Sequence, residues 1–137
     1  RRLATRVARL HWAGRSVRLL STSSSAEAPE LAVEMAPDTD GKVAVVFLNR
    51  PARMNALSFE MGADLLALTG PEALPDSVRA IVIAGAGQRA FSTGRDLKDS
   101  KDHTDEEAER YMRLARDTVL AMKHCALPTV AAVNGFA

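Results

Sequence analysis

The stretch of sequence that decides the fold is residues 78–98, VRAIVIAGAGQRAFSTGRDLK. It opens with an apolar run of strand length, and this run closes at Gly85-Ala86-Gly87. An apolar run without polar alternation predicts a strand that is covered on both faces, as in α/β proteins. The glycines also fit a dinucleotide-binding fingerprint, which needs a helix directly after the turn. Phe91-Ser92-Thr93-Gly94 contains poor helix formers, so we expect a loop here and no dinucleotide site.

Further segments extend this pattern in both directions. Residues 43–48 and 129–133 are two more apolar runs of strand length. Ser58 can cap a helix that reaches Leu68 and ends at Gly70-Pro71. Thr104 begins a capping-box pattern, and the stripe behind it that we expect to face the core consists of Ala108, Tyr111, Met112, Ala115, Val119 and Met122. The order strand, helix, strand, loop, long helix, strand predicts an α/β fold.

The N-terminal segment differs in composition from the rest of the chain. Residues 1–26 hold six of the 18 basic residues, all arginine, and none of the 17 acidic residues. The apolar residues that share one side of a helical wheel with arginines beside them are Leu3, Val7, Leu10 and Val17. Such a basic amphipathic helix is typical of a mitochondrial transit peptide, and Arg18-Leu19-Leu20 before Ser21 resembles a matrix-processing site. We therefore predict a transit peptide and linker over 1–28, a folded part over 29–137, and a location in the mitochondrial matrix.

A basic arm for nucleic acid and a disordered tail are the alternatives for this segment. Its positive charge alone would suit contacts with RNA or DNA phosphates. However, such an arm would usually contain lysine as well, and residues 1–26 contain none. The transit peptide is therefore the favoured interpretation, and we expect no nucleic-acid partner.

The chain offers few other candidates for chemistry. Its single cysteine, Cys125, cannot form an internal disulfide, and we expect an ordinary buried residue. An acidic run is formed by Asp96, Asp99, Asp102 and Asp105. The glycine and closing glutamate of a calcium loop are missing at the required offsets, so the run predicts a solvated acidic loop. The histidines have no partners at metal-ligand spacing, and no apolar run approaches the ~18 residues of a membrane span, so we expect neither a metal nor a membrane-spanning helix.

Four segments of the chain resemble one protein family, and they occur in the order found in that family. They are residues 48–57 (LNRPARMNAL), 78–87 (VRAIVIAGAG), 90–98 (AFSTGRDLK) and 128–137 (PTVAAVNGFA). Together they are similar to the N-terminal portion of the enoyl-CoA hydratase/isomerase family, the crotonases, and the resemblance covers about residues 31–137. It implies a crotonase-like α/β fold of stacked ββα units, truncated after its first portion.

The resemblance also implies a site for acyl-CoA. Crotonase-type proteins bind acyl-CoA thioesters and stabilise an enolate with two backbone N–H groups, an oxyanion hole. The residue after the loop glycine supplies the first donor, which is Arg95 here, and Gly94 would let the backbone turn toward the ligand. The second donor and the acid–base glutamates of the hydratases are implied to follow Ala137. No cofactor is implied beyond coenzyme A as part of the substrate, and a homo-oligomer, a trimer or hexamer, is expected.

Residues around this loop are expected to contact the coenzyme A moiety. By their place in the family motifs, they are Arg53, Ala56, Gly94, Arg95, Asp96, Leu97 and Lys98. Arg95 departs from the family, which commonly has a small residue at this position. Its side chain can point away from the thioester, reach the CoA phosphates or pair with a nearby acid. Arg53 can contact a phosphate or lie solvated, and the sequence leaves all of these options open.

The expected reaction is the hydration of an enoyl-CoA in fatty-acid or branched-chain acid breakdown. An enoyl-CoA isomerase of the same family and a non-catalytic crotonase-fold protein that binds CoA are the alternatives. The three differ in carboxylates that would lie beyond residue 137. We therefore expect residues 29–137 to be inactive by themselves.

Overall fold

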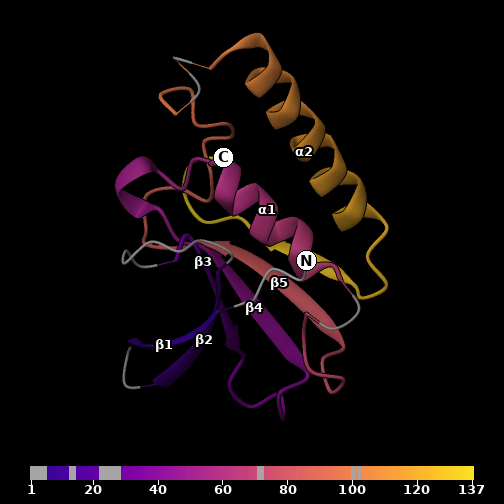
Figure 1. Ribbon diagram of the computed structural model, residues 1–137. Coiled ribbons are helices and arrows are strands. Elements are labelled where there is room, and N and C mark those ends of the chain that lie inside the picture. The colour runs from indigo at the N-terminus through magenta and orange to yellow at the C-terminus, as the bar shows by residue number, and fades with distance from the viewer. Residues whose placement is uncertain (1–5, 13–14, 22–28, 71–72, 100, 102) are drawn as a thin grey trace.

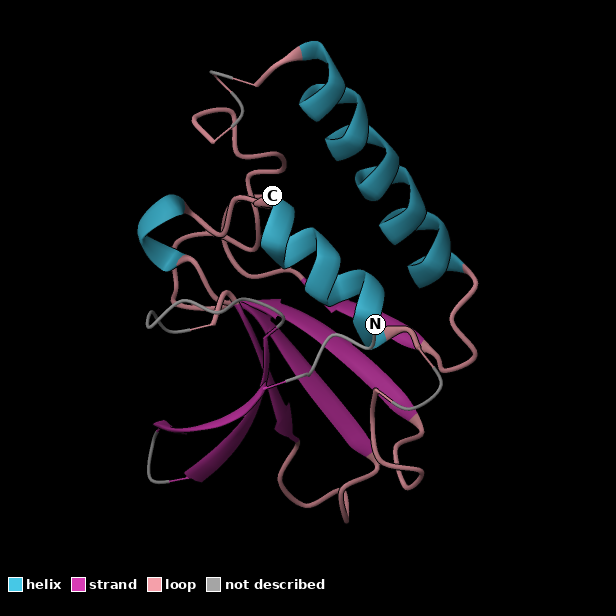
Figure 2. Cartoon of the chain, viewed as in Figure 1, coloured by secondary structure: helices cyan, strands magenta, loops and turns pink. Residues whose placement is uncertain are grey.

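The computed structural model describes residues 6–12, 15–21, 29–70, 73–99, 101 and 103–137. These residues form one six-stranded sheet in the order β1-β2-β3-β4-β5-β6, accompanied by helices (Figure 1, Figure 2). The strands are β1 (Arg6–Trp12), β2 (Arg15–Ser21), β3 (Leu31–Met35), β4 (Val43–Leu48), β5 (Ala80–Gly85) and β6 (Thr129–Ala132). The helices are the short 3-10 helix η1 (Pro51–Arg53) and the α-helices α1 (Phe59–Leu68) and α2 (Asp105–Lys123).

The sheet combines antiparallel and parallel pairing. β3 runs antiparallel to β4, with Leu31 opposite Leu48. β4, β5 and β6 are parallel, and α1 and α2 lie in the two crossovers between them, so that β3, β4 and α1 form one ββα unit. The predicted order of strand, helix, strand, loop, long helix and strand is confirmed. β3 is absent from that order because only its first three residues, Leu-Ala-Val, form a continuous apolar run, which Glu34 interrupts.

Both predicted helix starts are confirmed. The Ser58 hydroxyl accepts the Met61 N–H at 3.1 Å in front of α1. At α2, the Thr104 hydroxyl accepts the Glu107 N–H at 3.3 Å, and the Glu107 carboxylate accepts the Thr104 N–H at 2.8 Å, which completes a capping box. The bonds from the Thr104 N–H and hydroxyl lower the pKa of Glu107. α1 ends before Gly70 as predicted, and Pro71 lies outside the described residues.

The core lies between α1 and one face of the sheet. It consists of Leu31, Val33, Ala44, Val46, Leu48, Met61, Leu65, Leu68, Val78 and Ile81. Figure 1 shows both α-helices on the same side of the sheet, with α2 beside α1. In β4, buried residues alternate with half-buried ones, and all four residues of β6 are exposed. The prediction that the strands are covered on both faces is therefore wrong for the described part of the chain. The helices of both crossovers lie over the same face of the sheet, toward which every second side chain of β4 points.

Only part of the apolar stripe predicted for α2 faces the protein. Tyr111 and Thr118 are buried, and the Thr118 hydroxyl lies 2.8 Å from the Leu114 carbonyl of its own helix and 3.1 Å from the Gly62 carbonyl of α1. Met112 is 56% exposed and Val119 is 66% exposed, so the prediction that these two residues belong to the core is wrong. The line of contact with α1 runs through Tyr111 and Thr118. Side chains one position further along point about 100° away from that line.

The N-terminal segment forms a hairpin of strands where the sequence predicts a helix. β1 and β2 pair antiparallel, with Leu10 opposite Val17, and β2 joins β3 through the pair Leu19–Ala32. The amphipathic helix expected here is therefore wrong in this structure. A helix would satisfy only its own backbone groups, whereas a strand at this position also satisfies those on the edge of β3. Residues 1–5, 13–14 and 22–28 lie outside the described residues, and the transit peptide over 1–28 and the boundary at 29 stay predictions.

Candidate functional site

The candidate site begins where β5 ends. A Cβ atom on Gly85 would lie 2.3 Å from the carbonyl oxygen of Ala90, so only glycine allows the following loop to fold back this closely. The loop predicted at 91–94 is confirmed, since the described residues between β5 and α2 contain no helix. The chain instead passes through Gly94, whose φ of 78° favours glycine.

One backbone contact sets the orientation of Arg95. Leu57 donates its N–H to the Gly94 carbonyl at 2.8 Å and accepts the Asp96 N–H at 3.0 Å, which makes a parallel bridge between residues 57 and 95. In this pattern the residue between the two bonded ones directs its own N–H and carbonyl away from the partner. The Arg95 N–H therefore points away from Leu57, and it has no hydrogen-bond acceptor within the described part of the chain.

Arg95 also lines an open pocket of about 410 Å³. The pocket is lined by Ala52, Arg53, Met54, Ala56, Thr93, Arg95, Asp96, Leu97 and Lys98. Every residue predicted to contact coenzyme A is among them except Gly94, although they come from two segments far apart in the sequence. The structure thus brings the predicted residues together, while their contacts with a ligand stay predictions.

Asp96 is held inside the protein. Its side chain is 6% exposed and pairs with the Arg50 guanidinium at 2.8 Å. Its Oδ1 accepts the N–H groups of Lys98 and Asp99 at 3.1 and 3.3 Å. Burial raises the pKa of this carboxyl group, but the Asp99 N–H, the Arg50 side chain and the Lys98 N–H together hold the pKa below its ordinary value. The predicted solvated loop is therefore wrong at Asp96, because Arg50 supplies a buried counter-charge from 46 positions earlier, and Asp102 lies outside the described residues.

Arg50 joins the two segments that line the pocket. Its Nη1 donates to the Ala56 carbonyl at 2.8 Å as well as to Asp96, and its Nε lies 2.7 Å from the Glu30 carboxylate. The Ser58 hydroxyl also donates to Glu30. Arg50 is absent from the predicted site residues, because an arginine before a proline in a turn gives no local sign of its partners.

Asn55 holds the turn between η1 and α1 against the loop after β5. Its φ of 54° lies in the left-handed region, which asparagine tolerates better than most residues with a side chain. The side-chain Oδ1 accepts the Arg50 N–H at 3.0 Å, and Nδ2 donates to the carbonyls of Ala86 and Ala90 at 3.0 and 2.8 Å. Asn55 is also missing from the predicted site residues. Its place in a turn suggests its conformation but not these distant acceptors.

The Arg95 side chain lies against α2. Its guanidinium carbon is 4.5 Å from the centre of the Tyr111 ring, and Nη1 is 3.8 Å from the Met112 sulfur. No carboxylate lies within ion-pair distance of it in the described part of the chain, so the ion pair considered for Arg95 is not formed there. The Tyr111 hydroxyl donates to the Leu57 carbonyl at 2.5 Å, a contact that an apolar stripe gives no reason to expect.

Comparison with known proteins identifies the family. Residues 38–137 match the enoyl-CoA hydratase/isomerase family. The chain belongs to this family. The (E)-benzylidenesuccinyl-CoA hydratase of Thauera aromatica is 37% identical over 100 residues, which are 73% of this chain and 39% of the relative. The short-chain-enoyl-CoA hydratase of Clostridium acetobutylicum is 32% identical over 100 residues, which are 73% of this chain and 38% of the relative.

Solved structures of enoyl-CoA hydratases show the same fold. The crystal structure of an enoyl-CoA hydratase from Bacillus anthracis matches with a TM-score of 0.70 and 26% sequence identity, over 77% of this chain and 40% of that chain. The predicted crotonase-like α/β fold is thus confirmed. The chain spans about 40% of the length of the relatives that it matches.

In this enoyl-CoA hydratase/isomerase family member, the segment after β6 packs onto the loop after β5. The Phe136 N–H donates to the Arg89 carbonyl at 3.0 Å. The Asn134 side chain accepts the Gly85 N–H at 2.9 Å and donates to the Gly85 carbonyl at 3.0 Å. The fourth segment that resembles the family, residues 128–137, therefore lies directly beside the loop that leads to the candidate site.

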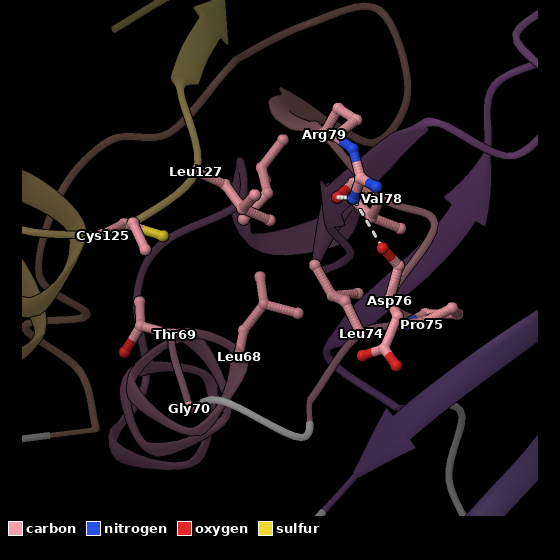
Figure 3. A pocket seen from close by; sticks show the side chains of 12 residues that line it. Leu68, Thr69, Gly70, Leu74, Pro75, Asp76, Val78, Arg79, Cys125 and Leu127 are labelled. Atoms are coloured by element: carbon pink, nitrogen blue, oxygen red, sulfur yellow. Dashed lines mark hydrogen bonds between the residues drawn. The ribbon is translucent and has the colours of Figure 1, made fainter.

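A second pocket, of about 260 Å³, lies at the opposite ends of the parallel strands, where β5 and β6 begin (Figure 3). Figure 3 shows its apolar walls, which include Leu68, Leu74, Val78 and Leu127. Cys125 at its edge is half-buried, whereas the sequence predicts a buried residue, because it lies in the turn before β6 beside this open space. Ligands of open α/β sheets bind beyond the carboxyl ends of the strands, so the pocket beside Arg95 is the stronger candidate.

Within the described residues, no group of three or more His, Cys, Asp or Glu side chains is placed to hold a metal ion. Neither α1 nor α2, the α-helices of the described part of the chain, combines the length and hydropathy needed to cross a membrane.

Proposed function

We propose that the complete protein is an enoyl-CoA hydratase of the mitochondrial matrix that acts in fatty-acid or branched-chain acid breakdown. Two relatives that share the segment containing the site, at 37% and 32% identity, are named hydratases. The observation that carries the proposal is the Arg95 N–H. It points away from Leu57, has no acceptor within the described residues, and belongs to a residue that lines an open pocket.

The proposed reaction adds water across the C2–C3 double bond of a 2-enoyl thioester. As the oxygen of water bonds to C3, one of its O–H bonds breaks and the proton passes to a carboxylate. The π electrons move toward the thioester, and negative charge develops on its carbonyl oxygen. The Arg95 N–H would donate a hydrogen bond to that oxygen, and a donor already oriented by the Leu57 bridge stabilises the charge without reorganisation. A proton then bonds to C2 and restores the carbonyl. The second N–H donor and the carboxylates that transfer protons are proposed to follow Ala137.

The electrostatics of the pocket support binding of the coenzyme A phosphates. Arg53 and Lys98 both line the pocket and are exposed, and neither forms an ion pair within the described part of the chain. The nearby negative charge of Asp96 is paired with Arg50. We therefore propose that Arg53 and Lys98 attract the phosphates, with Asp96 holding the loop in place.

The test uses the complete protein with a short 2-enoyl-CoA. Hydration removes the conjugated double bond, so we expect the ultraviolet absorbance of the thioester to fall and its mass to increase by one water. A 3-enoyl-CoA tests the isomerase alternative, because migration of the double bond raises the absorbance at unchanged mass. Binding of coenzyme A without either reaction would overturn the enzyme proposal and support a non-catalytic CoA-binding protein.

We also propose that the complete protein forms a homo-oligomer, a trimer or hexamer. Large apolar side chains are exposed in the described part of the chain, among them Val119 at 66% and Phe136 at 67%. Surfaces of this kind become covered by further sequence or by another subunit. Sedimentation of the complete protein tests this, and a monomer at micromolar concentration would contradict it.

A further inference from the structure

The hydroxyl group of Tyr111 connects α2 to the loop that carries the proposed oxyanion donor. Tyr111 is 5% exposed, and its hydroxyl donates to the Leu57 carbonyl at 2.5 Å. The same carbonyl accepts the Asp96 N–H at 3.0 Å, and a carbonyl oxygen has two lone pairs, so both bonds form together. Leu57 thus lies between α2 on one side and the Gly94–Asp96 backbone on the other.

The aromatic ring of Tyr111 makes a second contact with the same loop, through the side chain of Arg95. The Arg95 guanidinium lies over the ring at 4.5 Å, and its buried Nε has no hydrogen-bond partner within the described residues. The ring itself has aromatic neighbours, Phe59 at 6.3 Å and His103 at 6.4 Å between ring centres. α2 therefore contacts both the backbone bridge and the side chain of the residue that supplies the N–H.

Resting on the proposed function, we infer that Tyr111 is a positioning residue for the oxyanion hole, whose hydroxyl holds Leu57 so that the Arg95 N–H stays directed at the thioester oxygen. A preorganised donor works only while its direction is kept, and displacements on the order of 1 Å can cost ~10²-fold in rate. Burial raises the pKa of Tyr111 above its ordinary value of 10.0, against an opposing effect of Arg95, so the hydroxyl stays a donor at neutral pH. Tyr111 acts through Leu57.

The first experiment compares Tyr111→Phe with Thr118→Val in the complete protein. Tyr111→Phe keeps the buried ring and removes only the hydroxyl, so we expect kcat to fall about three- to tenfold, the effect of one hydrogen bond, with KM within about twofold. Thr118→Val is the matched control. It removes another hydroxyl of α2, which lies 3.1 Å from the Gly62 carbonyl of α1 and 2.8 Å from the Leu114 carbonyl of α2, and both acceptors are away from the loop. It should leave kcat unchanged.

The second experiment measures stabilisation of the enolate directly. A 3-ketoacyl-CoA ionises to an enolate with its own ultraviolet band, and an oxyanion hole lowers the apparent pKa of this ionisation in the bound ligand. We expect Tyr111→Phe to raise that pKa by about 0.5–1 unit relative to the parent protein, and Thr118→Val to leave it unchanged. The affinity for a saturated acyl-CoA should be the same in all three proteins.

The outcomes separate the inference from the function on which it rests. If the parent protein does not lower the pKa of the bound ligand, the proposed function fails. If it does, and Tyr111→Phe matches Thr118→Val in kcat and ligand pKa, the positioning role of Tyr111 is overturned. Hydrogen exchange of amides 94–97 is an independent measurement. It should be about three- to tenfold faster in Tyr111→Phe than in Thr118→Val, and equal exchange would also overturn the inference.

Discussion

Asp96 carries a buried negative charge beneath the candidate site, and Asp96→Asn tests how strongly this charge joins the two segments of the pocket. One carboxylate oxygen binds Arg50 at 2.8 Å and the other accepts two backbone N–H groups. Asparagine has a single acceptor oxygen, so its NH₂ group must face either the guanidinium or the backbone donors.

The magnitude follows from what Arg50 keeps after the substitution. Loss of one partner of a buried ion pair costs about 3–5 kcal/mol, and loss of a single charged hydrogen bond costs about 1.5–3 kcal/mol. Arg50 retains Glu30 at 2.7 Å and the Ala56 carbonyl at 2.8 Å, so it is not left unpaired. We therefore expect Asp96→Asn to lower the free energy of unfolding of the complete protein by about 2–3 kcal/mol at neutral pH.

The same pair predicts a pH dependence. The pKa of Asp96 in the folded protein lies below its ordinary value of 3.8, so its contribution to stability is complete above that value. The contribution is lost as the pH falls through the lower pKa of the folded state. Asp96→Asn cannot titrate, so the stability difference between the two proteins should be largest near neutral pH and shrink below pH 3.8.

Urea denaturation of the complete protein, followed by circular dichroism across this pH range, measures the effect. Asp99→Asn is the matched control in the same loop, because its side chain is exposed and its N–H bond to Asp96 is unaffected. We expect the control to stay within about 0.5 kcal/mol of the parent protein. Equal stability of the two variants at neutral pH, or a difference that persists on acidification, would refute the reasoning.

Three further predictions concern the Arg95 N–H donor, the transit peptide and the edge strand β6. In the complete protein, Arg95→Ala should keep most of the activity, because it keeps the backbone N–H. Arg95→Pro removes the N–H and should lower turnover by a factor of ~10²–10³. Full activity in a folded proline variant would exclude Arg95 from the oxyanion hole. A fluorescent reporter fused to residues 1–30 should enter mitochondria, as seen by microscopy, and a cytosolic or nuclear reporter would contradict the transit peptide. Residues 29–137 expressed alone should self-associate in size-exclusion chromatography, because β6 is an exposed edge strand with Val130 55% exposed, and a monomer with a cooperative melt would contradict this.

Features that depend on neighbouring residues could be predicted from the sequence. The helix starts at Ser58 and Thr104 are confirmed because an N-cap and a capping box involve residues within three positions. The strands at the three apolar runs are confirmed because runs of that length, separated by helices, have few other arrangements. The number of sheet faces that the helices cover could not be predicted. A strand such as β4 is apolar on both faces whether helices lie over one face or over two.

Features of the site that depend on distant residues could not be predicted. A run of aspartates looks the same whether it is solvated or has a buried partner, and only the fold brings Arg50 to Asp96. Tyr111 sits in an apolar stripe, and its hydroxyl acquires a role only because α2 passes over Leu57. Distant residues also change local structure. The segment of β1 and β2 has helical periodicity, but pairing with the edge of β3 makes it form strands.

These contacts explain how the loop accommodates the large side chain of Arg95. The proposed donor is a backbone N–H held by Leu57, so the side chain at position 95 is not needed for the hydrogen bond itself. A large cation there must still be placed, and α2 places it, because the face of the Tyr111 ring receives the guanidinium at 4.5 Å. The same tyrosine binds the carbonyl that orients the donor. Arg95 and Tyr111 therefore act as a pair: the ring holds the arginine side chain against α2, while the hydroxyl keeps the backbone beneath it in position.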